Sequence, residues 1–410
     1  MATSTNGCGV VVTGVGVISG LSCGITAIAE TIRAATLRTY EVNRQAGYHL
    51  PESSRLAVLS GGANLSAWVS PSMGRRMSVP SKFAVAAARM ALADGGLSSA
   101  VEGPRTAVVM SNALGTTDCT ERLLRTALLD SPEAVSPFTF TESVSNAATA
   151  QIAIDCKAQG SNLTIVQREA GILTAVGRGA AEIAAGRADR ALVGGVEEVP
   201  PLMHALLDRM QSLVRPQHEG GEVPRPFDRR RSGFLVSEGA VVLILENEQL
   251  ARSRGARIRV RVRSFGGAFD ASAPRIGWGR GDAVLADALR DGIARAGLTP
   301  ADIGRIVSGA SGSIAGDRLE AHMLRRVWRG MTLPPILAPK SVTGQYGGGF
   351  LAAAVLAASE ESFASPGDFS VDPELGIVPY AREPLPPPSV TLTTSLASGG
   401  AASWLLLEHV

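Results

Sequence analysis

The sequence predicts an α/β protein built from two related halves, and two features lead to this class. Short apolar runs rich in Val, Ile and Leu alternate with Ala-rich or amphipathic segments along the whole chain. Short buried strands separated by helices imply crossover connections and largely buried sheets. A helix, strand and glycine-loop pattern also occurs twice, and the simplest account of such self-similarity is an internal duplication.

The strands and helices of the first half can be placed in order. Residues 9–17 (GVVVTGVGV) predict a buried strand ending in a glycine turn, followed by an Ala-rich helix at 83–92 and a strand at 106–110. Apolar runs at 163–166, 191–193 and 240–245 predict three further short strands.

The internal repeat places the join between the halves. In one copy, a helix at 87–97 leads to a strand at 107–110 and the turn 112–115; in the other, 288–298 leads to 305–307 and the glycine loop 309–312. The join should fall near residues 247–255. We therefore expect one unit over residues 1–250 and another over 251–410.

Two later segments have their own patterns. Arg257, Arg259, Arg261 and Arg263 alternate with apolar residues, which predicts a half-exposed edge strand with its basic face toward solvent. A ligand site is the alternative interpretation of these arginines. Residues 384–388 (PLPPP) predict a stiff connector before the last hairpin.

Composition narrows the function. The 410 residues are 45% apolar, carry a net charge of +2 and contain few aromatic residues, which argues against a nucleic-acid partner. There is no apolar run of about 20 residues to span a membrane, and the polar residues 1–7 lack a secretory pattern. We therefore expect a cytoplasmic protein.

Neither cysteines nor histidines predict a metal site or cofactor. The four cysteines have no paired spacing, which favours free thiols in a reducing compartment, and the five histidines form no ligand pattern. They are Cys8, Cys23, Cys119 and Cys156, with His49, His204, His218, His322 and His409.

Several motifs converge on one family. Pro226-Phe227-Asp228, Gly233-Phe234 and Glu238-Gly239-Ala240 resemble the central signature of β-ketoacyl synthases, and residues 340–344 (KSVTG) and 395–401 (SLASGGA) resemble two of their loops. The order and spacing of the motifs carry the resemblance from the first strand to the last residues. It implies a thiolase-like five-layered α-β-α-β-α sandwich that dimerises through a sheet edge, here the strand at 162–167.

The family's catalytic positions are all altered. In residues 164–171 (TIVQREAG), a β-branched strand breaks into a helix where the family holds its reactive cysteine, and Glu169 occupies that position. The resemblance places the two catalytic histidines at Gly309 and Gln345. In the gating loop, Ser398 replaces an aromatic residue and is followed by Gly399 and Gly400. A carboxylate is a poor acyl acceptor for thioester chemistry, and no imidazole remains to drive decarboxylation.

This combination resembles the chain-length factor of type II polyketide synthases, the partner of a catalytic ketosynthase subunit. The subgroup usually has Gln-Ala-Gly at 169–171 and Thr-Gly-Arg at 343–345, so Glu169 and Gln345 are departures that also allow a reduced polyene branch. The resemblance implies a heterodimer with a ketosynthase, an acyl carrier protein that brings the growing chain, and a tunnel shared across the interface.

The resemblance also assigns other residues. The length gate maps onto Thr117, Thr120 and Leu124, which share one helix face; the alternative is that they merely pack the helix onto the core. Asp317, Glu320 and Lys340 should form a buried polar network. Residues 229–231, three arginines, could meet an acidic carrier protein or form a solvated loop.

Three roles are open for Glu169: filling a vestigial pocket with its charge offset by Arg168, the helix dipole or a partner residue, orienting an interface group, or acting in malonyl decarboxylation. The function expected is a non-catalytic chain-length factor. The alternatives are a malonyl-carrier decarboxylase or divergent acyltransferase that uses Glu169, and a homodimeric scaffold.

Overall fold

The computed structural model describes residues 9–60, 63–97, 101, 103–216, 221–360, 368–381 and 384–410. A ten-stranded sheet has the order β11-β10-β13-β14-β9-β1-β8-β6-β4-β5. One run of this sheet comes from the first part of the chain: β1 (Val10–Ser19), β4 (Thr106–Asn112), β5 (Asn162–Val166), β6 (Arg190–Glu197) and β8 (Gly239–Asn247). The other run follows: β9 (Val260–Phe269), β10 (Arg305–Val307), β11 (Ile336–Leu337), β13 (Val390–Leu396) and β14 (Ala401–His409).

The two runs have the same topology. Strand β8 is antiparallel to β1 and β6, and β4 is parallel to β6 and β5. In the second run β14 is antiparallel to β9 and β13, and β10 is parallel to β13 and β11. The runs meet where Val11 and Val12 of β1 pair with Arg261 and Val260 of β9. The repeat seen in the sequence thus corresponds to two copies of one strand arrangement.

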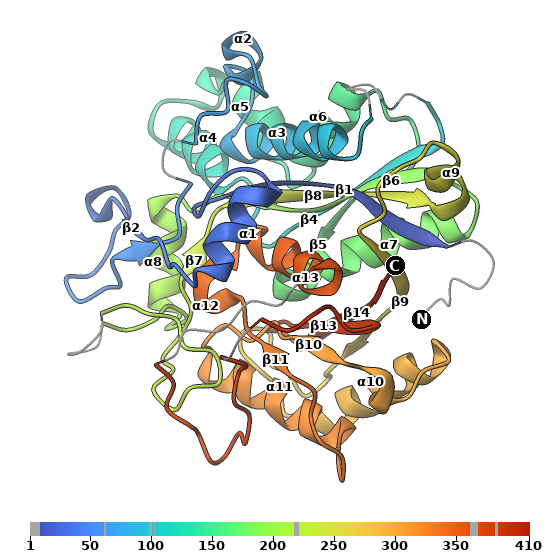
Figure 1. Ribbon diagram of the computed structural model, residues 1–410. Coiled ribbons are helices and arrows are strands. Elements are labelled where there is room, and N and C mark those ends of the chain that lie inside the picture. The colour runs from blue at the N-terminus through green and yellow to red at the C-terminus, as the bar shows by residue number, and fades with distance from the viewer. Residues whose placement is uncertain are drawn as a thin grey trace.

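Helices form three layers around these two runs (Figure 1). Helices α3 (Val79–Asp94) and α6 (Ala147–Cys156) cover the outer face of the first run, and α10 (Asp282–Arg295) and α11 (Ile314–Val327) lie outside the second. Helices α7 (Gly171–Ala184) and α13 (Gly349–Ser359) contact strands of both runs and lie between them. The predicted five-layered α-β-α-β-α sandwich, the thiolase-like fold, is confirmed.

The glycines of β1 serve close packing and not the expected turn. Strand β1 continues through Gly14 and Gly16 to Ser19, and all ten of its residues are buried. A Cβ atom on Gly16 would lie 1.9 Å from the carbonyl oxygen of Ala87 in α3. The absence of side chains therefore lets α3 lie directly on the strand.

The arginine-rich strand is not an edge, so that prediction was wrong. Strand β9 lies in the interior of the sheet, between β1 and β14. Arg259 is buried and binds Asp94, with Nη2 2.7 Å from Oδ1, while Arg261 binds Glu248 and Glu408. Alternation alone did not reveal that carboxylates from other elements neutralise this basic row.

Strand β5 lies at one edge of the sheet, as expected for residues 162–167, and β11 lies at the other. Strand β5 pairs with β4 at its end of the sheet. Next to it in order are α6, α5 (Pro137–Glu142) and α4 (Thr117–Leu129), each in contact with the next. Seven large apolar side chains on these elements are exposed, and we call them the edge surface: Leu124, Leu128, Leu129, Phe138, Phe140, Ile154 and Val166.

Smaller elements complete the chain. The helices are α1 (Ile25–Arg33), α2 (Pro71–Gly74), α8 (Pro201–Arg209), α9 (Glu248–Ser253) and α12 (Lys340–Thr343), with 3-10 turns at Arg44–Ala46, Pro132–Ala134, Arg168–Ala170 and Pro300–Asp302. The strands are β2 (Tyr40–Glu41), β3 (Leu56–Ala57), β7 (Val236–Ser237) and β12 (Gln345–Tyr346). The division at residues 250/251 falls within α9 and stays a prediction.

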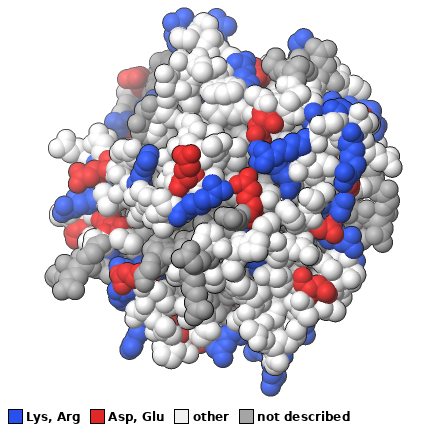
Figure 2. All heavy atoms as spheres, viewed as in Figure 1, with Lys and Arg blue, Asp and Glu red and all other residues white. Residues whose placement is uncertain are grey.

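The surface carries charges of both signs. On the face shown in Figure 2, Lys and Arg lie interspersed with Asp and Glu among uncharged atoms, in keeping with the net charge of +2. Within the part of the chain that the structure describes, every helix is too short or too polar to cross a bilayer.

Candidate functional site

Glu169 lies at the junction of the edge strand and the central helix. Strand β5 ends at Val166, a 3-10 turn at Arg168–Ala170 follows, and α7 begins at Gly171. Arg168 has a φ of 47°, in the left-handed region, which makes this turn sharp. The side chain of Glu169 points into the protein, with only 8% of the residue exposed.

The Glu169 carboxyl group accepts hydrogen bonds from two other residues. Tyr346 Oη donates to Oε1 over 3.1 Å and the Ser398 N–H donates to Oε2 over 3.2 Å. Burial raises the pKa of Glu169, while its own backbone N–H, the nearby Lys340 and the two bonds above oppose that rise. The group thus fills a site lined with donors.

Of the three ways considered for offsetting the charge of Glu169, a direct ion pair with Arg168 is not formed. Its Nη1 donates to the carbonyl and hydroxyl oxygens of Ser398, and its Nη2 to the carbonyl oxygen of Arg275. The cation nearest in effect to Glu169 is instead Lys340, whose own pKa burial lowers to about 8.

Of the two predicted histidine positions, Gln345 shares a chamber with Glu169, whereas Gly309 is not among the residues that line it. A Cβ atom on Gly309 would lie 2.6 Å from the carbonyl oxygen of Thr394, so no larger side chain fits without a shift. Gln345 is 2% exposed and lines a chamber of about 30 Å³ together with Glu169. Its Oε1 has no hydrogen-bond partner within the described structure.

Asp317, Glu320 and Lys340 are all buried, but each is held mainly by neutral groups. Asp317 accepts backbone N–H bonds from Phe227, Ser311 and Gly312. Its pKa is raised to about 7, chiefly by burial.

The other two members lie deeper. Glu320 Oε1 accepts from the hydroxyls of Ser308 and Thr394, at 2.7 and 2.6 Å. Lys340 Nζ donates to the carbonyl oxygen of Gly309 over 2.7 Å. These buried groups anchor the loops around them, and Glu320 and Asp317 also act on Lys340, opposing the lowering of its pKa by burial.

A cavity of about 520 Å³ leads to Glu169, a volume typical of small-molecule sites. We call it the Glu169 cavity. Helix α8 and Trp278 form much of its apolar wall, and Arg168, Tyr346 and Ser398 lie at its polar end. Several apolar residues of its lining are also exposed, namely Leu206, Met210, Ile276 and Ile314.

The predicted gating loop is the turn between β13 and β14. Ser398 donates its N–H to Glu169, and Gly399 and Gly400 follow with φ values of 90° and 101°. A Cβ atom on Gly400 would lie 2.5 Å from the carbonyl oxygen of Asp270. The two glycines therefore let the loop close tightly beside the carboxyl group.

The predicted length-gate residues lie on α4, away from the core. Thr117 and Thr120 donate their hydroxyls to the carbonyl oxygens of Leu114 and Thr116. Thr120 is exposed and Leu124 is 50% exposed. For Thr120 and Leu124 this exposure does not fit the alternative that they only pack α4 onto the core, whereas Thr117 is half-buried.

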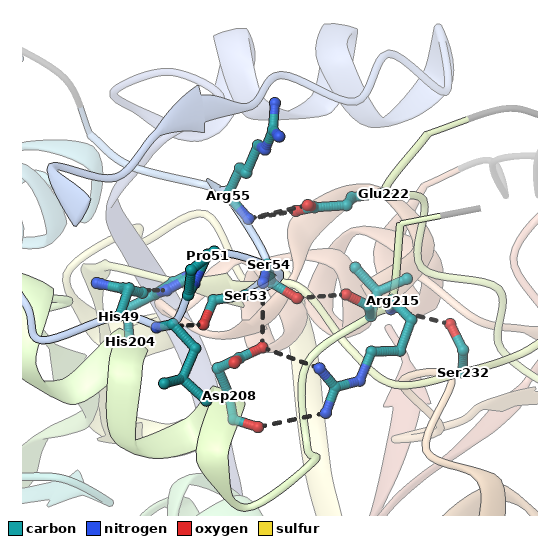
Figure 3. Close-up of polar contacts among 12 residues, drawn as sticks. His49, Pro51, Ser53, Ser54, Arg55, His204, Asp208, Arg215, Glu222 and Ser232 are labelled. Atoms are coloured by element: carbon teal, nitrogen blue, oxygen red, sulfur yellow. Dashed lines mark hydrogen bonds and ion pairs between the residues drawn. The ribbon is translucent and has the colours of Figure 1, made fainter. Parts of the chain in front are cut away.

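Two histidines that showed no pattern in the sequence meet beside α8, where His204 is fully buried (Figure 3). His49 Nε2 lies 2.9 Å from His204 Nδ1, and burial lowers the pKa of His204 to about 4. On the same helix, Asp208 Oδ1 accepts from the Ser54 N–H and from Arg215. These contacts fasten residues 49–54 to the helix that lines the cavity.

Among the described residues, no three His, Cys, Asp or Glu side chains are grouped to hold a metal ion. Cys23, Cys119 and Cys156 are free thiols, the last two of them buried. Cys8 and His218 lie outside the described residues.

The three arginines at 229–231 are mostly used within the chain. Arg230 binds Asp228 and Asp368, and Arg231 is buried and binds Asp372. Arg229 is exposed. The triplet therefore ties together two segments of this chain, and does not form the continuous basic surface that docking of an acidic carrier protein would need.

Sequence reasoning missed Tyr346 and the adjacent acids Glu197 and Glu198. Tyr346 has a φ of 80° and reaches Glu169 from the short strand β12, which no local pattern could indicate. The two acids directly follow the buried run 191–196. Consecutive carboxyl groups at the end of a buried strand were a usable signal, because buried charges persist mainly when they are bonded.

Comparison with known proteins identifies the family. The β-ketoacyl synthase N-terminal domain profile matches residues 9–251, and the C-terminal domain profile matches residues 268–360. Together they cover most of the chain, which belongs to the β-ketoacyl synthase family.

Two kinds of relative within that family are similar to this chain. A 3-oxoacyl-[acyl-carrier-protein] synthase 2 of Vibrio cholerae is 27% identical over 98% of this chain and 99% of its own length. A putative polyketide beta-ketoacyl synthase 2 of Streptomyces halstedii is 29% identical over 84% of this chain and 82% of its own.

Solved structures are similar throughout the fold. The ishigamide ketosynthase/chain length factor matches with a TM-score of 0.88 and 27% identity, covering 98% of this chain and 99% of its own. The type II polyketide synthase complex AntDE:AntF matches with a TM-score of 0.87 and 21% identity, covering 98% and 100% of the two chains, and at that identity shows the fold alone.

Proposed function

We propose that this chain is a chain-length factor: a β-ketoacyl synthase relative without condensing activity that pairs with a catalytic ketosynthase and shapes the elongation tunnel of a polyketide or polyene pathway. The observation that carries the proposal is the state of Glu169. Its carboxyl group replaces the thiol and occupies the hydrogen-bond donors of Tyr346 and Ser398. A thioester carbonyl therefore finds neither a nucleophile nor free donors there.

The edge surface supports a partner. Val166 at the end of the edge strand is 60% exposed and Leu128 of α4 is 80% exposed. An unpaired sheet edge flanked by apolar side chains favours association with another chain. The similarity to the ishigamide ketosynthase/chain length factor supports a ketosynthase as that partner. The acyl carrier protein, named in the relatives' description, would dock mainly on the ketosynthase.

Reconstitution tests this function. The purified chain alone should not elongate an acyl thioester, whereas the chain with a ketosynthase that retains Cys and both His should form a stable complex and make product. With the partner, Glu169→Ala should keep wild-type turnover, because no step passes through the carboxyl group. Elongation by the chain alone would contradict the proposal, and a stable homodimer that ignores the ketosynthase would favour a scaffold.

The length gate gives a second expected result. Thr117→Phe should shorten the product, because a bulky ring at the first turn of α4 would fill tunnel volume near the interface. Product masses from the reconstituted pair check this. Leu250→Phe, on the exposed side of α9, is the matched control and should leave them unchanged. Unchanged product length in an active Thr117→Phe complex would remove α4 from the gate.

An enzyme is the second candidate, a malonyl-carrier decarboxylase or divergent acyltransferase. The observation in its favour is a buried carboxyl group with a raised pKa at the end of a cavity, a common arrangement for an acid or base. Gly309 and Gln345 provide no cation to stabilise an enolate. Carbon dioxide release from malonyl-carrier protein by the chain alone, lost in Glu169→Ala, would support this candidate.

A further inference from the structure

Helix α4 lacks the usual means of securing its first turn. The first N–H groups of a helix have no partner within it and are normally bonded by the side chain of the preceding residue. Thr116 is that residue, but its side chain makes no capping bond, and its hydroxyl has no partner within the described structure. The helix start needs an acceptor from elsewhere.

Glu198 supplies this acceptor from the sheet. Its Oε1 accepts the backbone N–H of Asp118 over 2.9 Å. The preceding residue, Glu197, accepts the N–H groups of Ala113 and Leu114, in the turn that leads into α4. Both acids are 4% exposed, so these bonds are formed away from water.

The acids are themselves fixed in place. Glu197 is the last residue of β6, a strand buried in the middle of the first run. Beyond Glu198, the N–H of Val199 donates to Glu238, whose other oxygen accepts from Ser60. The position of α4 is thus set by the rigid end of a central strand.

We propose that Glu197 and Glu198 are positioning residues that hold the gate helix α4 in register with the sheet and thereby fix the length of the product. This inference rests on the proposed function, because it takes α4 as part of the tunnel wall. Thr117 and Thr120 flank Asp118 on the same turn, so movement of that turn moves the gate. Burial raises the pKa values of Glu197 and Glu198 to about 8 and 7. Their ionised forms are therefore costly to bury, and the backbone N–H bonds that they accept oppose that cost.

The test compares two substitutions of Glu198 in the full chain. Glu198→Leu removes the acceptor at similar size, and Glu198→Gln keeps a carbonyl oxygen that can bond the Asp118 N–H. Hydrogen exchange at residues 118–120 should be about tenfold faster or more in the Leu variant, the effect of losing one buried hydrogen bond, and close to wild type in the Gln variant. Glu222→Leu, which removes a carboxyl group from the N–H groups of Arg55 and Leu56, is the matched control and should not affect α4.

Product analysis of the reconstituted pair completes the test. The Leu variant should release a broader range of chain lengths, and the Gln variant should restore the wild-type product. Unchanged exchange at α4, or equal effects of Leu and Gln, would overturn the inference. Faster exchange in Glu198→Leu with unchanged products would also overturn the inference, provided that Thr117→Phe shortens the product. If neither Glu198→Leu nor Thr117→Phe alters product length, the gate assignment of the proposed function fails instead.

Discussion

Val166→Arg should abolish the complex with the ketosynthase while leaving the chain folded. Val166 ends the edge strand and is 60% exposed, so the substitution costs little in the isolated chain. In a heterodimer formed through this edge, the guanidinium would be buried without a partner. A penalty of that kind weakens binding by about 100-fold or more. Affinity measured by titration calorimetry, with product formation as a second readout, checks the result.

The matched control is Val284→Arg on α10. Val284 is also 60% exposed but lies on the outer layer of the second run, far from the edge strand in the layer order. It should bind the ketosynthase like wild type. Both variants should keep the wild-type midpoint in urea. Unimpaired binding by Val166→Arg would rule out β5 as the dimer edge.

Asp317→Ala should cause the largest loss of stability among the substitutions considered. Asp317 is 1% exposed and accepts N–H bonds from Phe227, Ser311 and Gly312. Alanine would leave these buried donors unsatisfied, which costs about 3–5 kcal/mol in the free energy of unfolding. Because the loops that Asp317 joins lie beside Gly309, the substitution should disturb the Glu169 cavity as well as lower the stability. Urea unfolding followed by circular dichroism gives the number.

Two comparisons give this result its meaning. Asp317→Asn keeps one acceptor oxygen and should lose only part of the stability. Asp291→Ala removes an exposed carboxyl group from α10 and should stay within about 0.5 kcal/mol of wild type. An Asp317→Ala variant as stable as Asp291→Ala would show that the carboxyl group does not anchor the loops.

Much of the fold could be predicted because the pattern is strong and repeated. The short apolar strands at 106–110 and 240–245 became β4 and β8, and the duplicated helix and strand became α3–β4 and α10–β10. Helix α13 escaped notice because its residues 349–358 are all buried, so it has no polar face and no helical period to detect. The position of β9 depended on carboxylates such as Asp94, far away in sequence.

The candidate site, like the fold, could be predicted only in part. Glu169, Gly309 and Gln345 were found because their neighbours resemble a family signature, and the fold does bring Glu169 and Gln345 to one chamber. The contacts of Glu169 could not be predicted, since Tyr346 and Ser398 approach it from loops about 180 and 230 residues away along the chain. Glu197 and Glu198 act by accepting hydrogen bonds from backbone N–H groups. Every residue type except proline has such a group, so the sequence does not mark the donors.

The crowding at Gly309 bears on how such a chain can evolve. A Cβ atom there would press on Thr394 and Ser395, so an imidazole cannot return unless the neighbouring strand end moves as well. A cysteine placed at residue 169 alone would still lack the family's two imidazoles, because residues 309 and 345 are Gly and Gln. For a chain of this kind, gaining the Cys-His-His set would require changes at several positions together, and no single substitution would supply it.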